Sequence, residues 1–201
     1  MKLRLPRRPR DRLLAGAAAL AVLAGAGTWT AAAASGDEPA VHRLDQVLRL
    51  PGADANGSAG TDIDTSFFTA GDASGRRPAV LLGHGFGGSK DDVRAQAERL
   101  ARDGYAVMTW SARGFGRSGG RIGLNDPDHE VKDVSALVDW LARRPEVRLD
   151  APGDPRVGVA GASYGGAVAL LAAGYDRRVD AIAPQITYWN LADSPGPSLG
   201  R

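Results

Sequence analysis

The 201-residue sequence contains no cysteine, which excludes disulfide bonds, a thiol nucleophile and a cysteine-ligated metal site. It has three histidines, His42, His84 and His129, and their spacing matches no metal-binding motif. We therefore expect no metal ion and no other bound cofactor. Histidine is also missing from every position after residue 129, so the C-terminal part of the chain offers no imidazole as a general base.

An excess of basic charge is missing from most of the chain. The formal net charge is +2, but residues 1–34 carry six basic residues and one acidic residue. The remaining 167 residues carry 19 basic and 22 acidic side chains, so their net charge is −3. A nucleic-acid-binding surface is therefore not indicated.

The N-terminus has the three-part pattern of a secretory signal peptide. A basic head over residues 1–12 precedes 22 uncharged residues, 13–34, which end in a run of alanines. This pattern predicts export, cleavage after Ala33 or Ala34, and an extracytoplasmic location. The alternative is an uncleaved anchor, because residues 13–34 are long enough to tether the protein to a membrane. Their alanine and glycine content favours the cleaved form.

The rest of the chain is expected to form one α/β domain. Residues 35–60 are interpreted as a linker and a first strand, and residues 61–201 as the main domain. Apolar runs predict strands at 41–50, 61–69, 79–82, 105–110, 157–160 and 179–186, and amphipathic or apolar patterns predict helices at 89–103, 127–145 and 167–173. Ser89 and Asp92 are spaced as a capping box for the first helix. Residues 146–155, which are rich in proline and aspartate, are expected to form a loop. Strands that alternate with helices favour a mostly parallel sheet with flanking helices.

The sequence GASYG, residues 161–165, has the G-x-S-x-G pattern of a nucleophile elbow. An apolar strand containing Val157 and Val159 precedes it, and an apolar helix follows it. In such a strand–turn–helix unit the central residue is strained and its side chain stands above the sheet. Ser163 is therefore the predicted nucleophile. The alternative is a glycine-rich turn that happens to contain a serine.

Two backbone N–H groups are candidates for an oxyanion hole. The N–H of Tyr164 directly follows the nucleophile. The second candidate is the N–H of Phe86, in the glycine-rich loop that follows the strand at 79–82, where Gly85 lets the backbone turn inward. We interpret His84 in the same loop as a structural residue.

The acid and the base of a catalytic triad are harder to place. In the expected chain order the acid and then the histidine follow the serine, but no histidine follows Ser163. Asp176 and Asp180 flank the start of the last strand, at the wrong end of the sheet. Asp193 lies beyond that strand and is a weak candidate for the acid.

Four segments together resemble a known enzyme family. They read HGFGGSKDD, RDGYAVMTWSARGFGRSGG, DVSALVDWLARRP and GASYGG. Over roughly residues 60–193 the chain resembles the peptidase S15 or CocE/NonD group, which contains X-Pro dipeptidyl-peptidases and cocaine-esterase-like hydrolases. The resemblance implies an α/β-hydrolase fold and a Ser-Asp-His triad, with Ser163 as nucleophile and Tyr164 in the oxyanion hole. Arg113 matches a loop of the family and is interpreted as a loop-stabilising residue.

The chain also departs from this family pattern. Cocaine-esterase-like members carry a tyrosine at the position of Phe86, and Ser111 stands where the family often has aspartate. Both differences weaken the case for an X-Pro specificity. The cap, acid and histidine that follow in the family are not found, so the sequence resembles the N-terminal part of a longer enzyme, truncated after the strand that follows the nucleophile helix.

We therefore expect an exported serine hydrolase that cleaves a small-molecule ester or a peptide bond through an acyl-enzyme on Ser163. Two alternatives remain, a catalytically incomplete fragment and a non-catalytic binding module with the same fold. The sequence leaves open whether the substrate is an ester or a peptide, and also the oligomeric state.

Overall fold

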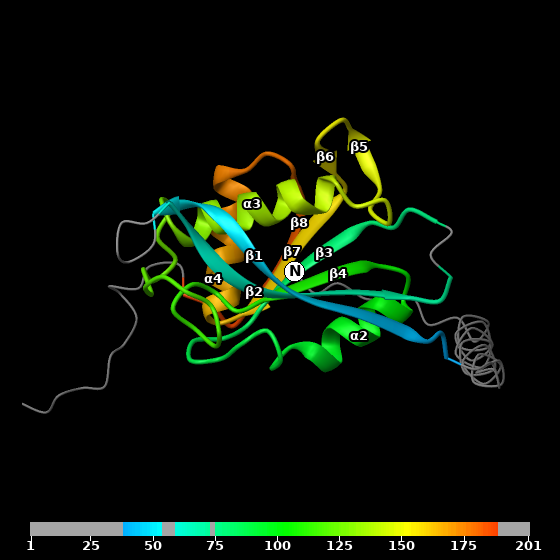
Figure 1. Ribbon diagram of the computed structural model, residues 1–201, viewed down its shortest axis with the longest axis horizontal. Coiled ribbons are helices and arrows are strands. Elements are labelled where there is room, and N and C mark those ends of the chain that lie inside the picture. The colour runs from blue at the N-terminus through cyan, green and yellow to red at the C-terminus, as the bar shows by residue number, and fades with distance from the viewer. Residues whose placement is uncertain (1–37, 54–58, 73–74, 189–201) are drawn as a thin grey trace, which may run out of the picture. The chain divides into compact units, whose positions relative to one another are not determined.

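The computed structural model describes residues 38–53, 59–72 and 75–188 (Figure 1). The predicted signal peptide or anchor at residues 1–34 and the candidate acid Asp193 lie outside these residues. The strands are β1 Val41–Ala53, β2 Ala59–Ala70, β3 Ala79–Gly83, β4 Ala106–Trp110, β5 Leu149–Ala151, β6 Asp154–Pro155, β7 Val157–Ala162 and β8 Val179–Gln185, and the helices are α2 Arg94–Arg102, α3 Glu130–Ala142 and α4 Tyr164–Tyr175. No helix in the described part of the chain has the length and hydropathy needed to cross a membrane.

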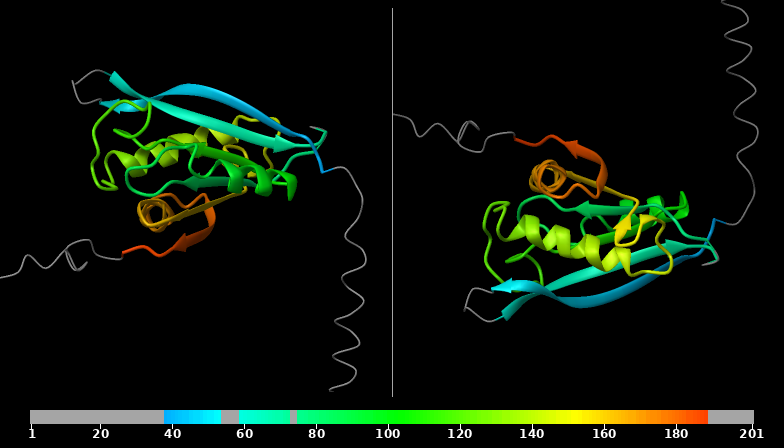
Figure 2. Two further views of the ribbon diagram at one scale, coloured as in Figure 1. Left: turned by 90° about the horizontal axis from the view of Figure 1, so that it is seen from below. Right: turned by 90° about the horizontal axis from the view of Figure 1, so that it is seen from above.

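Six strands form one sheet in the order β1-β2-β4-β3-β7-β8. Strands β4, β3, β7 and β8 are parallel, whereas β1 and β2 form an antiparallel hairpin that pairs with β4. Figure 2 shows this long hairpin at one edge of the sheet and β8 at the other. The predicted mostly parallel sheet is confirmed. Its parallel strands end on one side of the molecule, where their loops meet.

Apolar side chains on both faces of the sheet explain why helices cover it on two sides. Helices α3 and α4 pack on one face, and α2 packs on the other (Figure 1). All five residues of β4 are buried, as expected for a central strand. The apolar stripe of α3 is also buried, and it consists of Val131, Val134, Leu137, Val138 and Leu141.

Two local predictions are wrong. Helix α2 begins at Arg94, not after Ser89, because residues 90–93 form a turn that tertiary contacts hold in place. The side chain of Asp92 does accept the Ser89 N–H at 2.8 Å, but the Lys90 N–H donates to the Ser111 hydroxyl at 3.1 Å instead of entering a helix. The region 146–155, expected to be a loop, contains the short β5–β6 hairpin, whose turn is closed by Gly153 at φ 78°.

Candidate active site

Ser163 stands at the tight turn between β7 and α4. Its backbone has φ 53° and ψ −115°, a region that residues other than glycine rarely adopt, and its side chain is exposed. Contacts on both sides hold this conformation: the Ser163 N–H donates to the Gln185 carbonyl at 3.0 Å, and its carbonyl accepts from the Thr187 hydroxyl at 2.8 Å. The turn therefore presents the hydroxyl above the carboxyl ends of the strands, as in a nucleophile elbow.

Glycine is required on both sides of Ser163 because the turn packs against the end of β3. A Cβ atom at Gly165 would lie 2.5 Å from the Gly83 carbonyl oxygen and 2.9 Å from the His84 carbonyl oxygen. A Cβ atom at Gly161 would lie 2.7 Å from the carbonyl carbon of Gly165. The two outer glycines of the pentapeptide therefore permit an approach that any side chain would prevent.

The loop after β3 brings Phe86 next to the elbow. Its ring is 62% exposed and meets the rings of Phe115 and Tyr164 edge-on, with centroids 5.3 and 5.7 Å apart. Tyr164 is the first residue of α4, so its N–H has no acceptor within the helix, and Ser163 makes no side-chain capping bond. Both segments predicted to supply oxyanion donors therefore lie beside Ser163. The donor roles themselves remain predictions.

The contacts of His84 exclude it as a base for Ser163. The side chain is buried, and its Nε2 accepts the Ala112 N–H at 3.0 Å. The proton must therefore be on Nδ1, which donates to the Gly85 carbonyl at 2.7 Å. Burial lowers the pKa of the imidazole and keeps it neutral. His84 thus joins the loops after β3 and β4.

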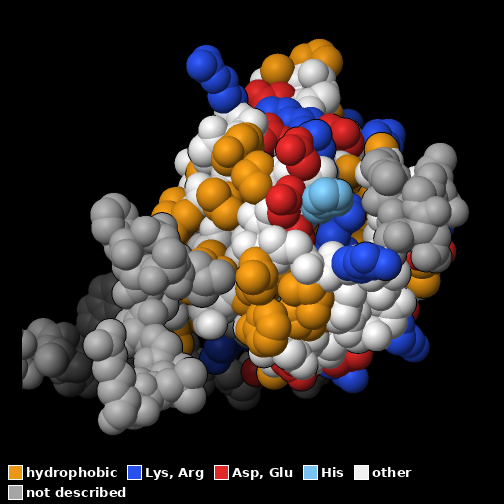
Figure 3. Space-filling model, turned by 90° about the vertical axis from the view of Figure 1, so that its left-hand side faces the viewer, with side chains coloured by type: hydrophobic (Ala, Val, Ile, Leu, Met, Phe, Trp, Pro, Cys, Tyr) orange, Lys and Arg blue, Asp and Glu red, His pale blue; other side chains and the backbone are white. Residues whose placement is uncertain are grey.

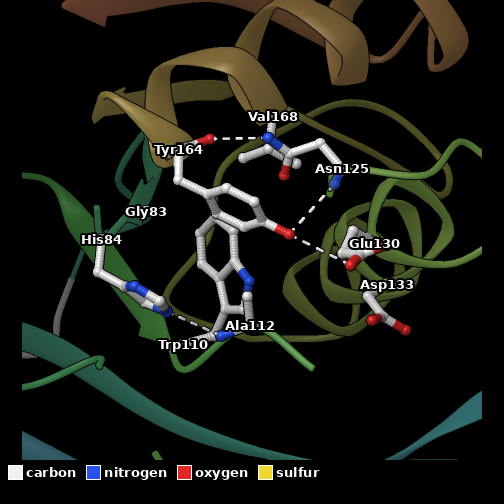
Figure 4. Close-up of a pocket in the computed structure, with 10 residues that line it drawn as sticks. Gly83, His84, Trp110, Ala112, Asn125, Glu130, Asp133, Tyr164 and Val168 are labelled. Atoms are coloured by element: carbon white, nitrogen blue, oxygen red, sulfur yellow. Dashed lines mark hydrogen bonds between the residues drawn. The ribbon is translucent and has the colours of Figure 1, made fainter. Parts of the chain in front are cut away.

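Tyr164 is held by a loop whose role was not found from the sequence. The Asn125 N–H donates to the Tyr164 hydroxyl and the Asn125 side-chain amide donates to the Tyr164 carbonyl, both at 3.1 Å (Figure 4). The Tyr164 hydroxyl donates to Glu130 at 3.2 Å, and burial raises the pKa of this phenol. These contacts fix the first residue of α4, whose N–H is the predicted oxyanion donor. Asparagine tolerates the φ of 64° found at Asn125, which is the one local signal in the sequence.

Arg113 ties the loop after β4 to α3. Its Nε and Nη2 each donate to one carboxylate oxygen of Asp133 at 2.7 Å, and both side chains are buried. A bidentate pair of this kind fixes geometry as well as charge. Arg113 therefore has the contacts of a loop-stabilising residue and is not placed against Ser163.

A second buried ion network holds the loop after β3 to strand β2. Lys90, whose side chain is fully buried, donates to Asp64 at 2.7 Å, to the Thr65 carbonyl at 3.0 Å and to Asp45 at 3.1 Å. All three ammonium donors are satisfied, as a buried lysine requires.

Asp45 is the partly exposed member of this network. Burial acts to raise its pKa, but hydrogen bonds from Ser66, Lys90 and Arg43 outweigh it and lower the pKa to about 2. Nothing in the sequence pattern pointed to Lys90.

The described residues do not supply the acid and the base. His42 contacts the Gly71 carbonyl and His129 contacts Asp126, so no histidine hydrogen bonds to Ser163. Asp176 pairs with Arg178 and Asp180 accepts the Val157 N–H, both at the amino end of β8, far along the strand from Ser163. Within the described ranges, no group of three or more histidine, aspartate or glutamate side chains is placed to hold a metal ion.

Comparisons with known proteins agree with this geometry. The family model of the X-Pro dipeptidyl-peptidases (S15 family) matches residues 59–196. An uncharacterised protein of Pseudomonas aeruginosa, PA2218, is 32% identical over 115 residues, which cover 56% of this chain and 30% of that protein. The quorum-quenching protein AidA of Acinetobacter baumannii is 34% identical over 113 residues, which cover 55% of this chain and 36% of AidA. The chain thus spans about a third of the length of these relatives.

Solved structures show the same fold. The crystal structure of PA2218 superposes with a TM-score of 0.59 at 23% identity, and covers 94% of this chain and 49% of that one. The α/β hydrolase GrgF from Penicillium has a TM-score of 0.56 at 25% identity, with 70% of this chain and 44% of GrgF covered. Together with the strand order, these similarities establish the α/β-hydrolase fold that the motifs implied.

Proposed function

The chain belongs to the X-Pro dipeptidyl-peptidase (S15) family of α/β-hydrolases, and from this premise we propose that it cleaves a small-molecule ester or a peptide bond through an acyl-enzyme on Ser163. The observation that carries the proposal is the strained backbone and exposed side chain of Ser163, at a turn that requires glycine two residues before and two residues after the serine. Strain of this kind persists where the surrounding structure enforces it, and it gathers at functional sites.

The proposed reaction has two steps. The Ser163 oxygen bonds to the substrate carbonyl carbon while its proton passes to a general base, and the tetrahedral intermediate then expels an alcohol or amine that takes up that proton. Water next attacks the acyl-enzyme, which releases the acid and restores the serine hydroxyl. The N–H groups of Tyr164 and Phe86 would stabilise the oxyanion, and each such donor typically lowers the activation barrier by about 3 kcal/mol.

We propose that the general base lies outside residues 38–188. His42, His84 and His129 hydrogen bond to other groups, and none of them hydrogen bonds to Ser163. Asp193 remains the candidate acid. A non-catalytic binding module is the competing proposal, and the missing contact between Ser163 and a histidine favours it. Without a complete triad, an α/β-hydrolase domain keeps only about 10³–10⁴-fold acceleration over water.

Labelling with a fluorophosphonate tests the proposal. The natural protein, isolated from its host, is treated with the probe and the modified peptide is identified by mass spectrometry. We expect stoichiometric modification of Ser163, its loss in Ser163→Ala, and full labelling in Ser135→Ala, whose serine lies on α3. Absence of label on Ser163 in the natural protein would leave the binding module as the function.

We also propose that the protein is exported and acts outside the cytoplasm, with residues 13–34 as a cleaved signal or as a membrane tether. The intact mass of the natural protein in medium and membrane fractions distinguishes the two. A mature N-terminus near residue 34 or 35 in the medium supports cleavage, and an intact N-terminus in membranes supports the tether. Recovery from the cytoplasm alone would refute export.

A further inference from the structure

Backbone strain gathers around Ser163. In the described part of the chain, four residues other than glycine have positive φ: Leu124 at 58°, Asn125 at 64°, Ser163 at 53° and Ile186 at 38°. For a β-branched residue such as Ile186 this is a true outlier. All four lie in loops at the carboxyl ends of β4, β7 and β8. A strained backbone persists where the surrounding structure enforces it. Here it is found at two apolar residues, Leu124 and Ile186, in the loops at the same end of the sheet as Ser163.

Large apolar side chains are exposed at the same edge of the sheet. Phe86 is 62% exposed, Ile122 40%, Leu124 51% and Ile186 90%, and we call these four residues the apolar rim. They come from the loops after β3, β4 and β8. Figure 3 shows this side of the molecule, where apolar side chains gather in patches beside charged ones. Exposure of large apolar side chains to water is unfavourable, and an apolar patch on a protein surface often marks a site that binds a ligand or a partner.

Hydrogen bonds place the rim at the elbow. Ile186 lies between Gln185 and Thr187, and both of these residues bond to the backbone of Ser163, at 3.0 and 2.8 Å. Leu124 precedes Asn125, which donates to Tyr164 at 3.1 Å. The Phe86 ring contacts the Tyr164 ring directly. Each of these three rim side chains is thus within one residue of a contact to Ser163 or Tyr164.

The buried carboxylate beside the elbow is already committed to hydrogen bonds within the protein. Glu130, the carboxylate next to Tyr164, is buried and accepts hydrogen bonds from the Tyr164 hydroxyl and from the N–H groups of Gly123 and Asp126. Asp126 accepts from the Asp128 N–H at 2.7 Å and from His129 at 3.1 Å. Among the described residues, an ammonium group at the rim would therefore lose water without gaining an ion pair with the buried Glu130, and Asp126 is 41% exposed and remains in contact with water.

We propose that the apolar rim binds the hydrocarbon part of the acyl group, so that the substrates are esters of apolar carboxylic acids and not N-terminal dipeptides. This inference rests on the proposed function of Ser163. Full burial of one CH₂ group favours binding about fourfold. Because the rim is open to solvent on one side, we expect about half of that free energy, a twofold gain per CH₂.

Titration of the 201-residue protein with unreactive ketones tests the rim without requiring catalysis. The probes run from acetone to 2-octanone, and methyl NMR follows Ile122, Leu124 and Ile186. We expect shifts at these methyl groups and a dissociation constant that falls about twofold per added CH₂. A constant that does not depend on chain length, or tighter binding of alanyl-proline amide at the same methyl groups, would overturn the inference.

Ile186→Asn separates a binding role from a folding role. Asparagine tolerates the positive φ and loses little packing at a side chain that is 90% exposed, so the unfolding temperature should hold or rise. Binding of 2-octanone should weaken at least threefold. Phe86→Ala should weaken it similarly, while Tyr175→Ala, an exposed apolar residue at the end of α4, should leave it unchanged.

The outcomes distinguish this inference from the proposed function. Labelling of Ser163 without chain-length-dependent binding at the rim refutes only the rim. Chain-length-dependent binding without labelling refutes only the hydrolase and leaves an apolar binding site. Unchanged binding in both Ile186→Asn and Phe86→Ala also refutes the rim.

Discussion

Replacing Gly165 by alanine should destabilise the protein, because α4 meets the end of β3 there without space for a methyl group. The new Cβ would lie 2.5 Å from the carbonyl oxygen and 2.7 Å from the carbonyl carbon of Gly83, and 2.9 Å from the His84 carbonyl oxygen. All three are backbone atoms of the segment that leads out of a central strand, so they cannot rotate away as a side chain would.

The magnitude follows from two opposing effects. Alanine is favoured over glycine within a helix by about 1 kcal/mol. Overpacking of a rigid site costs roughly 1–3 kcal/mol, and three backbone contacts below 3.0 Å place this site at the upper end. We expect a net loss of about 2 kcal/mol in the free energy of unfolding, and a melting temperature about 4–8 °C lower.

Gly174→Ala is the matched control on the same helix. No heavy atom lies within 4 Å of its added Cβ, so only the helix preference remains and the variant should gain about 0.5–1 kcal/mol. Thermal and urea unfolding of both variants, followed by circular dichroism, measure the difference. If Gly165→Ala is as stable as Gly174→Ala, close packing at the elbow is not the reason for glycine, and the reasoning is refuted.

Three further predictions concern the network and loops around the site. Lys90→Met should lower the free energy of unfolding by about 3 kcal/mol, because it leaves Asp64 buried without its main partner. Adding Asp64→Asn should recover part of that loss in urea titrations, and equal stability of the single and double variants would contradict this. Asn125→Ala should lower the free energy of unfolding by about 2 kcal/mol, because the donor to the Tyr164 carbonyl is lost and alanine tolerates the positive φ less well than asparagine. It should also slow fluorophosphonate labelling of Ser163, and an unchanged labelling rate would show that Asn125 does not position the site. The pKa of Asp45 is lowered from 3.8 to about 2, so its charge stabilises the folded state above about pH 4, and this stabilisation is lost as the pH falls from about 4 to 2. Asp45→Asn should therefore reduce the fall in the free energy of unfolding between pH 4 and pH 2, and an unchanged fall would show that Asp45 is not responsible.

Much of the fold was predictable because it depends on residues close together in the chain. The alternation of apolar runs predicted the parallel strands, and the spacing of Val131, Val134, Leu137 and Leu141 predicted the buried face of α3. The elbow is also local: a strand, five residues and a helix set the backbone around Ser163. The β5–β6 hairpin was missed because its strands are only three and two residues long.

The surroundings of the elbow were not predictable in the same way. Asn125 reaches Tyr164 across 39 residues of sequence, and Lys90 reaches Asp64 across 26. Such pairs carry no periodic signal, since a single polar residue in a loop has the same appearance whether water or a buried partner satisfies it. The true start of α2 belongs to this group, because the Lys90 contacts keep residues 90–93 out of the helix.

The sequence by itself determined the order of strands and helices, the position of Ser163 and the need for glycine beside it, because local sterics and hydrophobic periodicity act over a few residues. Only the tertiary structure decided that His84 is a neutral link between loops, that Asn125 and Glu130 hold Tyr164, and that exposed apolar side chains lie in the loops at the same end of the sheet as the serine. The physical reason is that the ends of parallel strands meet at one edge of the sheet. Residues distant in the chain become neighbours there, and their contacts set which groups remain free for chemistry.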